Sequence, residues 1–494
     1  MTKICTFRLP SPTPGPQDVP PPTPLYDSLT TNLPHPSMAF SSFPFPSSTP
    51  LFPPAKTVEE YLQAYTDHFN LRPHIRLRTR VTNATYNHSS AKWLVRTSDL
   101  SQASENASKE HEFDLLLVCN GHHNVARYPR VKGLSDWLTS RRASHSVYYR
   151  NPSLAPFALD KEHTVLVVGG GPSGQDIVFD ISPVVKTVIH SASEYSPSNP
   201  EKPLDQGNVQ HRGRLVSFSE NGTVEFQGGV IEHGIDYCIL ATGYEVSFPF
   251  IPPIFIKEGL PEAVPPLPRG TWNTSHGVFP LVRYLFPFSL SQEPSPSSSS
   301  VSPLPAGPPP TSIAFLGLLV RVIPMPLVEV QARAALAAFS NPSKVDWTRE
   351  AVDVVQRYEE LKTRLRNESG RSDDVTSEEK IQRALFRFEP MEQFDYRDSL
   401  VDMIAELEGR TSDDTLGVSR VKQWERDIYA RKNILRQTWR ALEASGESDT
   451  WISGVGEGRH GRSGEEEWVE LMWKVVRRGE ETGTTYCAEA KANL

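Results

Sequence analysis

A glycine-rich turn carries the most specific chemical signal in the chain. The stretch VVGGGPSGQDI contains Gly169, Gly171 and Gly174 at the spacing of a dinucleotide-binding turn. In such turns the first glycine permits a tight bend, the second lets backbone approach a pyrophosphate, and the third lets a helix pack on a strand. Pro172 and Ser173 lie between them, at the start of the helix, where free N–H groups favour a phosphate. We therefore predict that these five residues bind a dinucleotide.

The turn needs a strand before it and a helix after it, and the sequence supplies both. HTVLVV is apolar and β-branched, SGQDIVFDIS has apolar residues at helical spacing, and KTVIHSAS predicts a second strand. A motif flanked in this way is much more specific than the three glycines alone. The alternative is a glycine turn that holds no ligand.

Two segments repeat each other without a gap. FDLLLVCNGHH and IDYCILATGYE place Asp114 in register with Asp236, and Gly121 with Gly243. An apolar run that ends at a glycine is typical of a buried parallel strand, and ligands of doubly wound sheets lie outside the carboxyl ends of such strands. The repeat predicts two related nucleotide-binding units, although chance similarity of two buried strands is the alternative.

Only the second unit has a glycine turn. The single glycine among residues 1–120 is Gly15, which is surrounded by prolines. The position of the turn, about a third of the way along the chain, therefore indicates that it is the second of two, and that the first is absent from this sequence.

Composition excludes several classes of protein. With 494 residues, 38% of them hydrophobic, the chain can bury at least two cores, and a net charge of −8 gives no basis for nucleic-acid binding. The four cysteines form no CxxC pair and two lie in apolar runs, so we predict buried thiols in a reducing compartment. The apolar window 313–330 contains Arg321, Pro324 and Pro326 and is a poor membrane span. We predict a cytoplasmic protein with no integral membrane segment and no metal site.

Five blocks of sequence resemble the fungal flavin-containing monooxygenases. PLYDSLTTNLPHPSMAFSSFPFP, VCNGHHNVARYP, VVGGGPSGQDI, ILATGYEVSFPF and IAFLGLLVRVIPMPLVEVQARAA follow in that family's order and spacing, and MEQFDYRDSL resembles its C-terminal segment. The resemblance implies an α/β fold with two Rossmann-like domains, the NADP domain being inserted in the FAD domain, and a helical C-terminal extension. It divides the chain into an incomplete first FAD-binding part (1–157) and the NADP domain (158–250). A second FAD-binding part with a disordered loop at 287–311 follows (251–345), and then a helical region with a polar tail (346–494).

The resemblance also implies the chemistry and the residues that serve it. In that family NADPH reduces FAD, O₂ adds at the flavin C4a position to give a hydroperoxide, and one oxygen passes to an amine or sulfide. Asn32 would hydrogen-bond the peroxide, and an ordinary turn asparagine is the alternative. Gly121, His122, Thr242 and Gly243 would lie against the cofactors, with the histidine positional rather than catalytic.

The chain departs from the family in three places. The FAD glycine motif and its acidic ribose ligand would fall before residue 1, so the FAD pyrophosphate is expected to lack its cradle. The family motif FxGxxxHSxxY here has Thr139 and Arg141 in place of its Phe and Gly. The 2′-phosphate is usually read by a Ser/Arg pair, whereas here Ser191 and Ser193 occur without an arginine, which leaves NADP and NAD open.

Two functions therefore remain open. The chain is either an FAD- and NADPH-dependent monooxygenase or an inactive remnant that binds NADP(H) without FAD. A disulfide reductase on the same fold is disfavoured because a redox cysteine pair is missing.

Beyond Phe339 the sequence predicts helices. VDWTREAVDVVQRYEELKTRLRN and QWERDIYARKNILRQTWRALEA each have apolar residues at helical spacing. The charged, glycine-rich tail from Ser445 is expected to be largely without structure.

Overall fold

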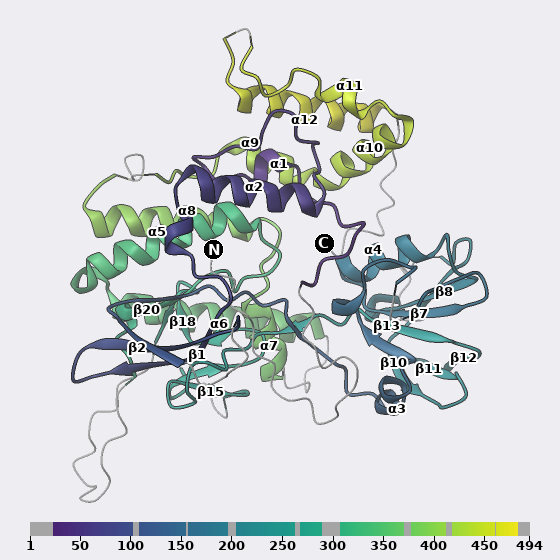
Figure 1. Cartoon of the computed structure of the whole chain (residues 1–494), viewed down its shortest axis with the longest axis horizontal. Coiled ribbons are helices and arrows are strands. Elements are labelled where there is room, and N and C mark those ends of the chain that lie inside the picture. Colours follow the sequence, from purple (N-terminus) through teal and green to yellow (C-terminus); the bar gives the residue numbers. More distant parts are fainter. Residues whose placement is uncertain are drawn as a thin grey trace, which may run out of the picture.

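The computed structural model covers the whole chain in two α/β units topped by a layer of helices (Figure 1). The parts of the chain that it describes are residues 23–101, 108–154, 157–195, 204–261, 267–288, 307–369, 377–411, 417–459 and 461–482. The predicted disordered loop at 287–311 falls mainly outside these residues, as do Cys5, Gly15 and Cys487.

The predicted second nucleotide-binding unit contains a five-stranded, fully parallel sheet. The strand order is β6-β13-β7-β8-β9. Of these strands, the sequence predicts β7, β8 and β13 but not β6 and β9. The strands span Ala143–His145, Tyr237–Leu240, Thr164–Val168, Thr187–Ser191 and Val209–Arg212. Since β6 belongs to this sheet, the unit takes in a strand from before residue 158, where the sequence placed the boundary.

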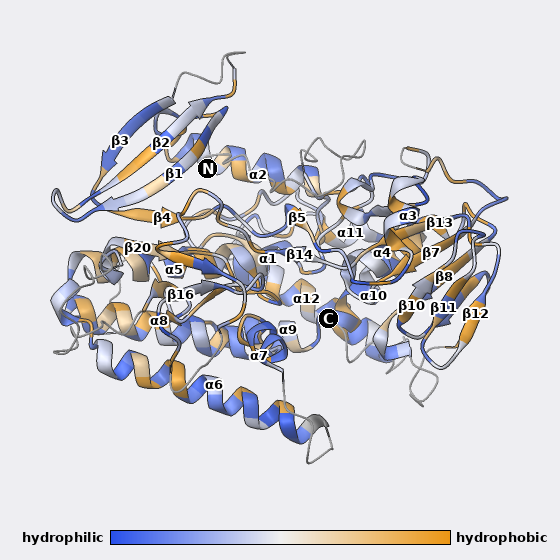
Figure 2. Cartoon of the chain, turned by 90° about the horizontal axis from the view of Figure 1, so that it is seen from below, coloured by the Kyte–Doolittle hydropathy of each residue, from blue (hydrophilic) through white to orange (hydrophobic). Residues whose placement is uncertain are grey.

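Both faces of this sheet are covered, which explains why its strands are apolar throughout. Helix α4 (Pro172–Ile181) packs on one face through Ile177 and Ile181. Helix α3 (Leu134–Thr139) and the antiparallel strands β10 (Leu215–Phe218), β11 (Val224–Phe226) and β12 (Val230–Glu232) cover the other, where Trp137 is buried. Figure 1 shows β7, β8 and β13 between α4 on one side and β10, β11, β12 and α3 on the other, and Figure 2 shows that these three strands are predominantly apolar.

The first unit has a smaller parallel sheet. Strand β4 (Leu116–Val118) pairs only with β20 (Ile313–Phe315) among the described strands. The repeat predicted a buried strand here, and this holds for Val118 but not for Leu117, whose side chain is 37% exposed. Cys119 is also exposed, so the prediction of buried thiols is correct only for Cys238.

Antiparallel strands surround this small sheet. They form a three-stranded sheet of β1 (Thr79–Asn87), β2 (Lys92–Asp99) and β3 (Ser108–Phe113), a second of β15 (Ile256–Glu258), β16 (Thr271–Asn273) and β17 (Val278–Phe279), and two-stranded pairs. The pairs are β5 (Val125–Ala126) with β14 (Tyr244–Glu245), and β18 (Leu281–Val282) with β19 (Phe286–Pro287). The shared core includes Trp93, whose indole N–H donates to the Ser312 carbonyl at 2.9 Å.

Four helices follow the strands of the first unit in the chain. They are α5 (Pro324–Ser340), α6 (Trp347–Ser369), α7 (Glu378–Leu385) and α8 (Glu392–Glu408). The first of the two predicted amphipathic helices is α6, which runs along the outside of the molecule (Figure 2). Helix α5 enters the core with Ala334, Ala335 and Ala338, whose small side chains allow close packing against α8.

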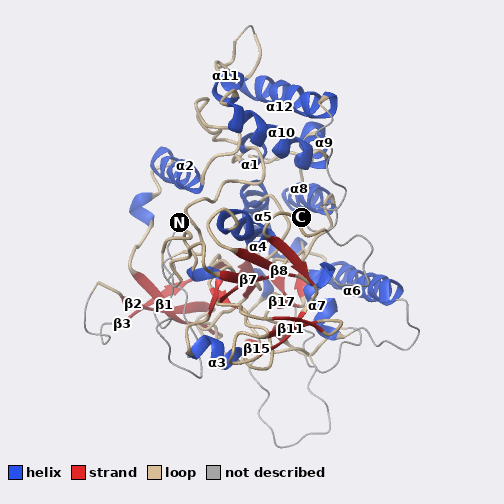
Figure 3. Cartoon of the chain, turned by 90° about the vertical axis from the view of Figure 1, so that its right-hand side faces the viewer, coloured by secondary structure: helices blue, strands red, loops and turns tan. Residues whose placement is uncertain are grey.

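The C-terminal helices stack above the rest of the molecule with the N-terminal segment (Figure 3). The second predicted helix is two helices, α9 (Gln423–Ala430) and α10 (Lys432–Ser445), because Arg431 leaves the helical conformation at φ −108°, ψ 10°. The layer also contains α1 (His35–Met38), α2 (Ala55–His68) and α11 (Ser448–Ile452). None of the helices within the described residues is both long enough and apolar enough to traverse a membrane.

The expectation of a largely unstructured tail is wrong for residues 464–481. Helix α12 (Gly464–Glu481) starts with a capping box between Ser463 and Glu466 and buries Met472, Val475 and Val476 against α10. Three consecutive glutamates in its first turn suit the positive end of the helix dipole. The charged positions that suggested a tail are the solvent face of this helix.

The crossing of α10 and α12 depends on Gly479. A Cβ at this position would lie 2.2 Å from Thr438 Oγ1 and 2.9 Å from Ile434 Cγ1. We predict that Gly479→Val forces α12 away from α10 and, through overpacking, lowers the free energy of unfolding by about 1–3 kcal/mol, which is measured as a lower denaturant midpoint. Arg477→Val, at an exposed position on the same helix, is the control. Equal midpoints for the two variants would show that this contact does not hold the helices together.

Candidate dinucleotide cleft

The three glycines of the turn between β7 and α4 have different surroundings. A Cβ on Gly169 would lie 2.2 Å from the Ala241 carbonyl oxygen, and Gly169 has φ +128°. A Cβ on Gly174 would lie 1.9 Å from the Gly169 carbonyl oxygen. Around Gly171, in contrast, no atom lies within 4 Å of that position. Gly169 and Gly174 therefore serve backbone packing, while Gly171 leaves open space in front of the helix.

That space is the start of α4. Gly171 is the N-cap, and Pro172 occupies the first turn, where its missing N–H costs nothing. Ser173 is half-buried beside it, and Gln175 Nε2 donates to the Gly170 carbonyl at 3.0 Å, which steadies the turn. The remaining free N–H groups and the helix dipole favour an anion at this position.

The second repeat, ATGY, forms the neighbouring wall. Thr242 Oγ1 donates to the Arg127 carbonyl at 2.6 Å, and Gly243 takes φ +81°. The Gly243 carbonyl accepts from the Arg127 N–H at 3.0 Å and from His145 Nε2 at 3.0 Å. Thr242 and Gly243 thus shape the strand end by hydrogen bonds, and both line the cleft.

The segment that departs from the family motif FxGxxxHSxxY, around His145, supports the turn at Gly243. His145 Nδ1 accepts from the Val147 N–H at 3.1 Å, which leaves Nε2–H to donate to Gly243. Burial lowers the pKa of His145 to about 4, so that the ring is neutral near pH 7. Arg141 stands where the family has glycine and still takes φ +60°, so the backbone shape persists without the glycine. Tyr149 Oη donates to the carboxylate of Asp180 on α4.

The first repeat contributes its strand end from the opposite side. Gly121 has φ +71° and turns the chain after β4. The rings of His122 and His123 are 4.2 Å apart, and His123 lies 5.2 Å from the Tyr244 ring. Burial lowers the pKa of His122, and it lowers that of His123 to about 4. Both rings are therefore neutral near pH 7.

Asn32 lies in the same cleft. It is exposed there, on a loop whose neighbours are fixed: the Thr31 N–H donates to the Pro53 carbonyl at 3.0 Å, and Thr30 Oγ1 accepts from Arg436 at 2.6 Å. The cleft has a volume of about 770 Å³ and includes, among the predicted residues, Asn32, His122, Gly171, Pro172, Thr242 and Gly243. Four segments distant in sequence thus meet around one space.

The two serines proposed to read a 2′-phosphate differ in their placement. Ser191 is fully buried, and its hydroxyl donates to the Gly213 carbonyl at 2.8 Å, so it does not present that group to a ligand. Ser193 is exposed just beyond β8. The prediction is therefore limited to Ser193.

Sequence reasoning missed Glu194, which follows Ser193. A Cβ on Gly170 would lie 1.7 Å from Glu194 Oε1, so the carboxylate rests against the glycine turn. A carboxylate after the second strand of such a unit accepts from a ribose 2′-hydroxyl and repels a 2′-phosphate. The position of Glu194 directly after the predicted strand KTVIHSAS is the sequence signal that could have identified it as a candidate ribose ligand.

The largest omission was the positive charge of the cleft. The C-terminal helices and the segment after β20 add cationic side chains to the lining: Arg321, Arg383, Arg387, Lys432, Arg436 and Arg440. Arg127 adds another, and the carboxylates that line the cleft are Asp176 and Glu379. The net charge of −8 concealed this local excess of positive charge.

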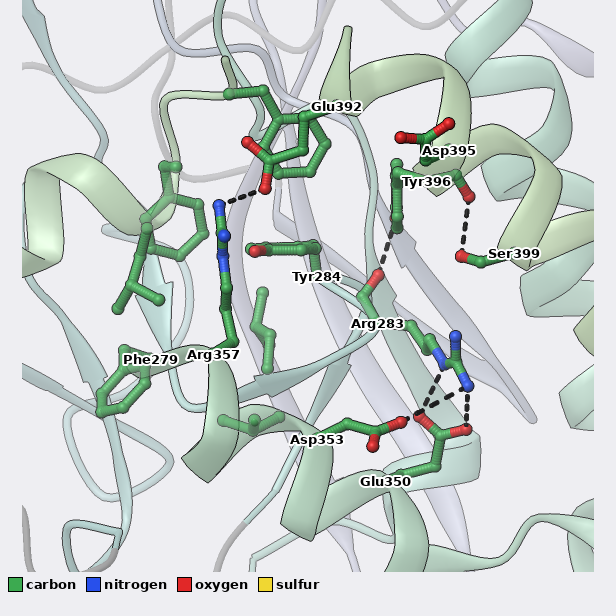
Figure 4. A pocket seen from close by; sticks show the side chains of 15 residues that line it. Phe279, Arg283, Tyr284, Glu350, Asp353, Arg357, Glu392, Asp395, Tyr396 and Ser399 are labelled. Atoms are coloured by element: carbon green, nitrogen blue, oxygen red, sulfur yellow. Dashed lines mark hydrogen bonds and ion pairs between the residues drawn. The ribbon is translucent and has the colours of Figure 1, made fainter. Parts of the chain in front are cut away.

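A second cavity, of about 310 Å³, shows the opposite arrangement (Figure 4). It lies between α6, α8 and the strand segment around Tyr284, and its arginines face carboxylates. Arg283 Nε lies 2.7 Å from Glu350, and Arg357 pairs with Glu392. Carboxylates outnumber arginines in this lining, and each arginine has a carboxylate partner, so the arginines need no external anion.

Comparisons with known proteins agree with the resemblance seen in the sequence. Residues 21–197 match the family model described as flavin-binding monooxygenase-like. A thiol-specific monooxygenase of Saccharomyces cerevisiae is 34% identical over 245 residues, which is 49% of this chain and 53% of that protein. A flavin-containing monooxygenase of Arabidopsis thaliana is 33% identical over 236 residues, 46% of this chain and 48% of that protein.

The solved structures extend the similarity in fold to nearly the whole chain. An S-allyl-L-cysteine S-oxygenase from Allium sativum superposes with a TM-score of 0.61 at 21% identity, covering 94% of this chain and 85% of that one. This confirms the predicted α/β class with its helical C-terminal region. In sequence, the chain spans about half the length of the relatives it matches.

The open space at Gly171 gives a prediction with an internal control. The Cβ of Gly171→Leu has open space around it and its side chain would occupy the cleft, so we expect the variant to fold but to bind NADPH at least about tenfold more weakly. Gly174→Leu, whose side chain would meet backbone, should instead lower the melting temperature. Unchanged NADPH affinity in a folded Gly171→Leu protein would refute the assignment of the turn.

Glu194 gives a second prediction, on the choice between dinucleotides. Glu194→Gln removes a negative charge beside the expected ribose site, which relieves repulsion of a 2′-phosphate and weakens acceptance from a 2′-hydroxyl. We therefore expect the ratio of the NADPH to the NADH dissociation constant to fall about three- to tenfold. Glu162→Gln, at an exposed site outside the cleft, is the control. A ratio of the two constants that does not change would exclude Glu194 from the ribose site.

Proposed function

We propose that this chain, a relative of the flavin-containing monooxygenases, uses FAD and NADPH to insert one oxygen atom of O₂ into a sulfur or nitrogen nucleophile. The observation that carries the proposal is the single cleft in which the α4 N-terminus, both repeat ends and Asn32 meet. FAD, when bound, supplies hydride acceptance and O₂ activation, chemistry that no side chain provides.

The residues of the chain bind and orient in this proposal. The start of α4 with Gly171 holds the phosphates of the nicotinamide dinucleotide. Asn32 donates and accepts hydrogen bonds without titrating, which suits a position beside reacting oxygen. His122 and His123 are neutral near pH 7 and enclose the ring end of the cleft without adding charge to it.

The lining fits the two ends of FAD unequally. Its ring end has aromatic, amide and backbone partners from Asn32, His122 and the Thr242 turn. For the FAD phosphates, the described part of the first unit offers the paired strands β4 and β20. No described helix N-terminus lies between these two paired strands. The partners for phosphate on that side of the cleft are the arginines.

A soft sulfur nucleophile is the substrate class that we propose first. The Saccharomyces cerevisiae relative is named for thiols, and the cleft is lined largely by uncharged walls at its histidine end. Amine nitrogen is the other member of this class of nucleophiles.

The second candidate is a protein that binds a nicotinamide dinucleotide but no flavin. The half-exposed β4, with Leu117 37% exposed and a single described partner strand, favours it. It predicts the same behaviour of Gly171 but no flavin spectrum.

The experiment that decides between them uses the full chain, purified and incubated with FAD. We expect a flavin absorbance band and NADPH oxidation that a thiol or sulfide accelerates, with Asn32→Ala lowering product formed per NADPH oxidised. A colourless protein that still binds NADPH stoichiometrically would establish the second candidate. Absence of NADPH binding would refute both.

A further inference from the structure

Three arginines come together on the wall of the cleft that faces α4. Arg321 lies in the turn between β20 and α5, Arg383 in the last turn of α7, and Arg387 in the link between α7 and α8. Backbone pairing joins these segments: the Val320 N–H donates to the Phe386 carbonyl at 2.9 Å, and Val320 bridges to Arg387. The fold therefore holds these side chains together although Arg321 is more than sixty positions from the other two.

No described carboxylate is in contact with the three side chains, and Glu389 and Glu194 act on them only from a greater distance. Within the described residues, none of them has a carboxylate within 4.0 Å, whereas Arg283 and Arg357 of the second cavity are paired. Arg321 and Arg387 are half-buried, and Arg383 is exposed toward the cleft. Burial and then the charges of Arg321 and Arg383 lower the pKa of Arg387 to about 10, against the opposing effect of Glu389 and Glu194. Burial also lowers the pKa of Arg321.

Such a cluster is stable only at a cost. Half-buried like charges repel each other and lose solvation, and an anion that accepts several hydrogen bonds compensates both effects. Guanidinium groups suit a phosphate in particular, because their planar donors bind two of its oxygens at once.

The opposite wall points to the same class of ligand. The N-terminus of α4, a helix of ten residues, lines the same cleft through Gly171, Pro172 and Gln175. Along a third side, α10 presents Lys432, Arg436 and Arg440. An anion in this space is therefore surrounded by positive potential from separate elements.

We propose that Arg321, Arg383 and Arg387 form a binding site for the phosphate groups of a dinucleotide held in the cleft. The proposal rests on the assignment of this cleft to dinucleotides and adds a phosphate site that is independent of a glycine turn. The phosphates of FAD and of NADPH share this chemistry, and the experiment separates them.

Calorimetric titrations of the full chain with NADPH, FAD and inorganic pyrophosphate test the site. In Arg383→Gln/Arg387→Gln we expect at least about a tenfold loss of affinity for pyrophosphate and for whichever dinucleotide uses the site. Added NaCl should weaken binding by the parent protein more than by the double variant. Arg477→Gln, an exposed arginine of α12, is the control and should bind as the parent does.

Melting temperatures keep the test independent of folding. Without anions the double variant should be at least as stable as the parent, because a repulsion has been removed, and pyrophosphate should stabilise only the parent. Unchanged affinities of a folded double variant for all three ligands would overturn the arginine site and leave the proposed function intact. Arginine-dependent pyrophosphate binding without dinucleotide binding would leave the site and refute the proposed function. Binding of none of the three would refute both.

Discussion

The close approach of two strand ends is the constraint on which the cleft depends. The Gly169 turn passes so near Ala241 that a Cβ would lie 2.2 Å from its carbonyl oxygen. This contact sets where α4 begins. Two residues after Ala241, the Gly243 carbonyl accepts a hydrogen bond from the His145 ring. A change in either strand end would therefore move both the phosphate end of α4 and the wall that faces it.

The distribution of charge separates the two cavities of the molecule. In the cavity beside α6, Arg283 lies against Glu350 and Arg357 against Glu392, so the protein supplies its own counter-ions. In the cleft, desolvation and mutual repulsion act on Arg321 and Arg387 without a carboxylate in contact. Because buried charge is retained only where something compensates it, the second arrangement indicates a ligand and the first a structural role.

The sequence predicted the parts of this structure whose causes are local. Gly171 and Gly174 lie in a strand–turn–helix segment whose spacing alone determines their positions, and both have the surroundings that this spacing predicts. Burial of β4 could not be predicted in the same way, because it depends on the strands that pair with it and not on its apolar run. The solvent face of α12 resembled a polar tail for a similar reason, since its buried face has a partner only once α10 lies beside it.

The cation cluster lay beyond sequence reasoning because no local pattern marks it. Arg321 belongs to an apolar window and Arg387 to the link between two helices, and each alone resembles an ordinary surface arginine. They become neighbours through one backbone bridge, at Val320, between segments that have no sequence pattern in common. The C-terminal helices are therefore more than a cover over the core. They bring positive side chains to a cleft in which the α/β units contribute the backbone dipoles of α4 and the side chain of Arg127.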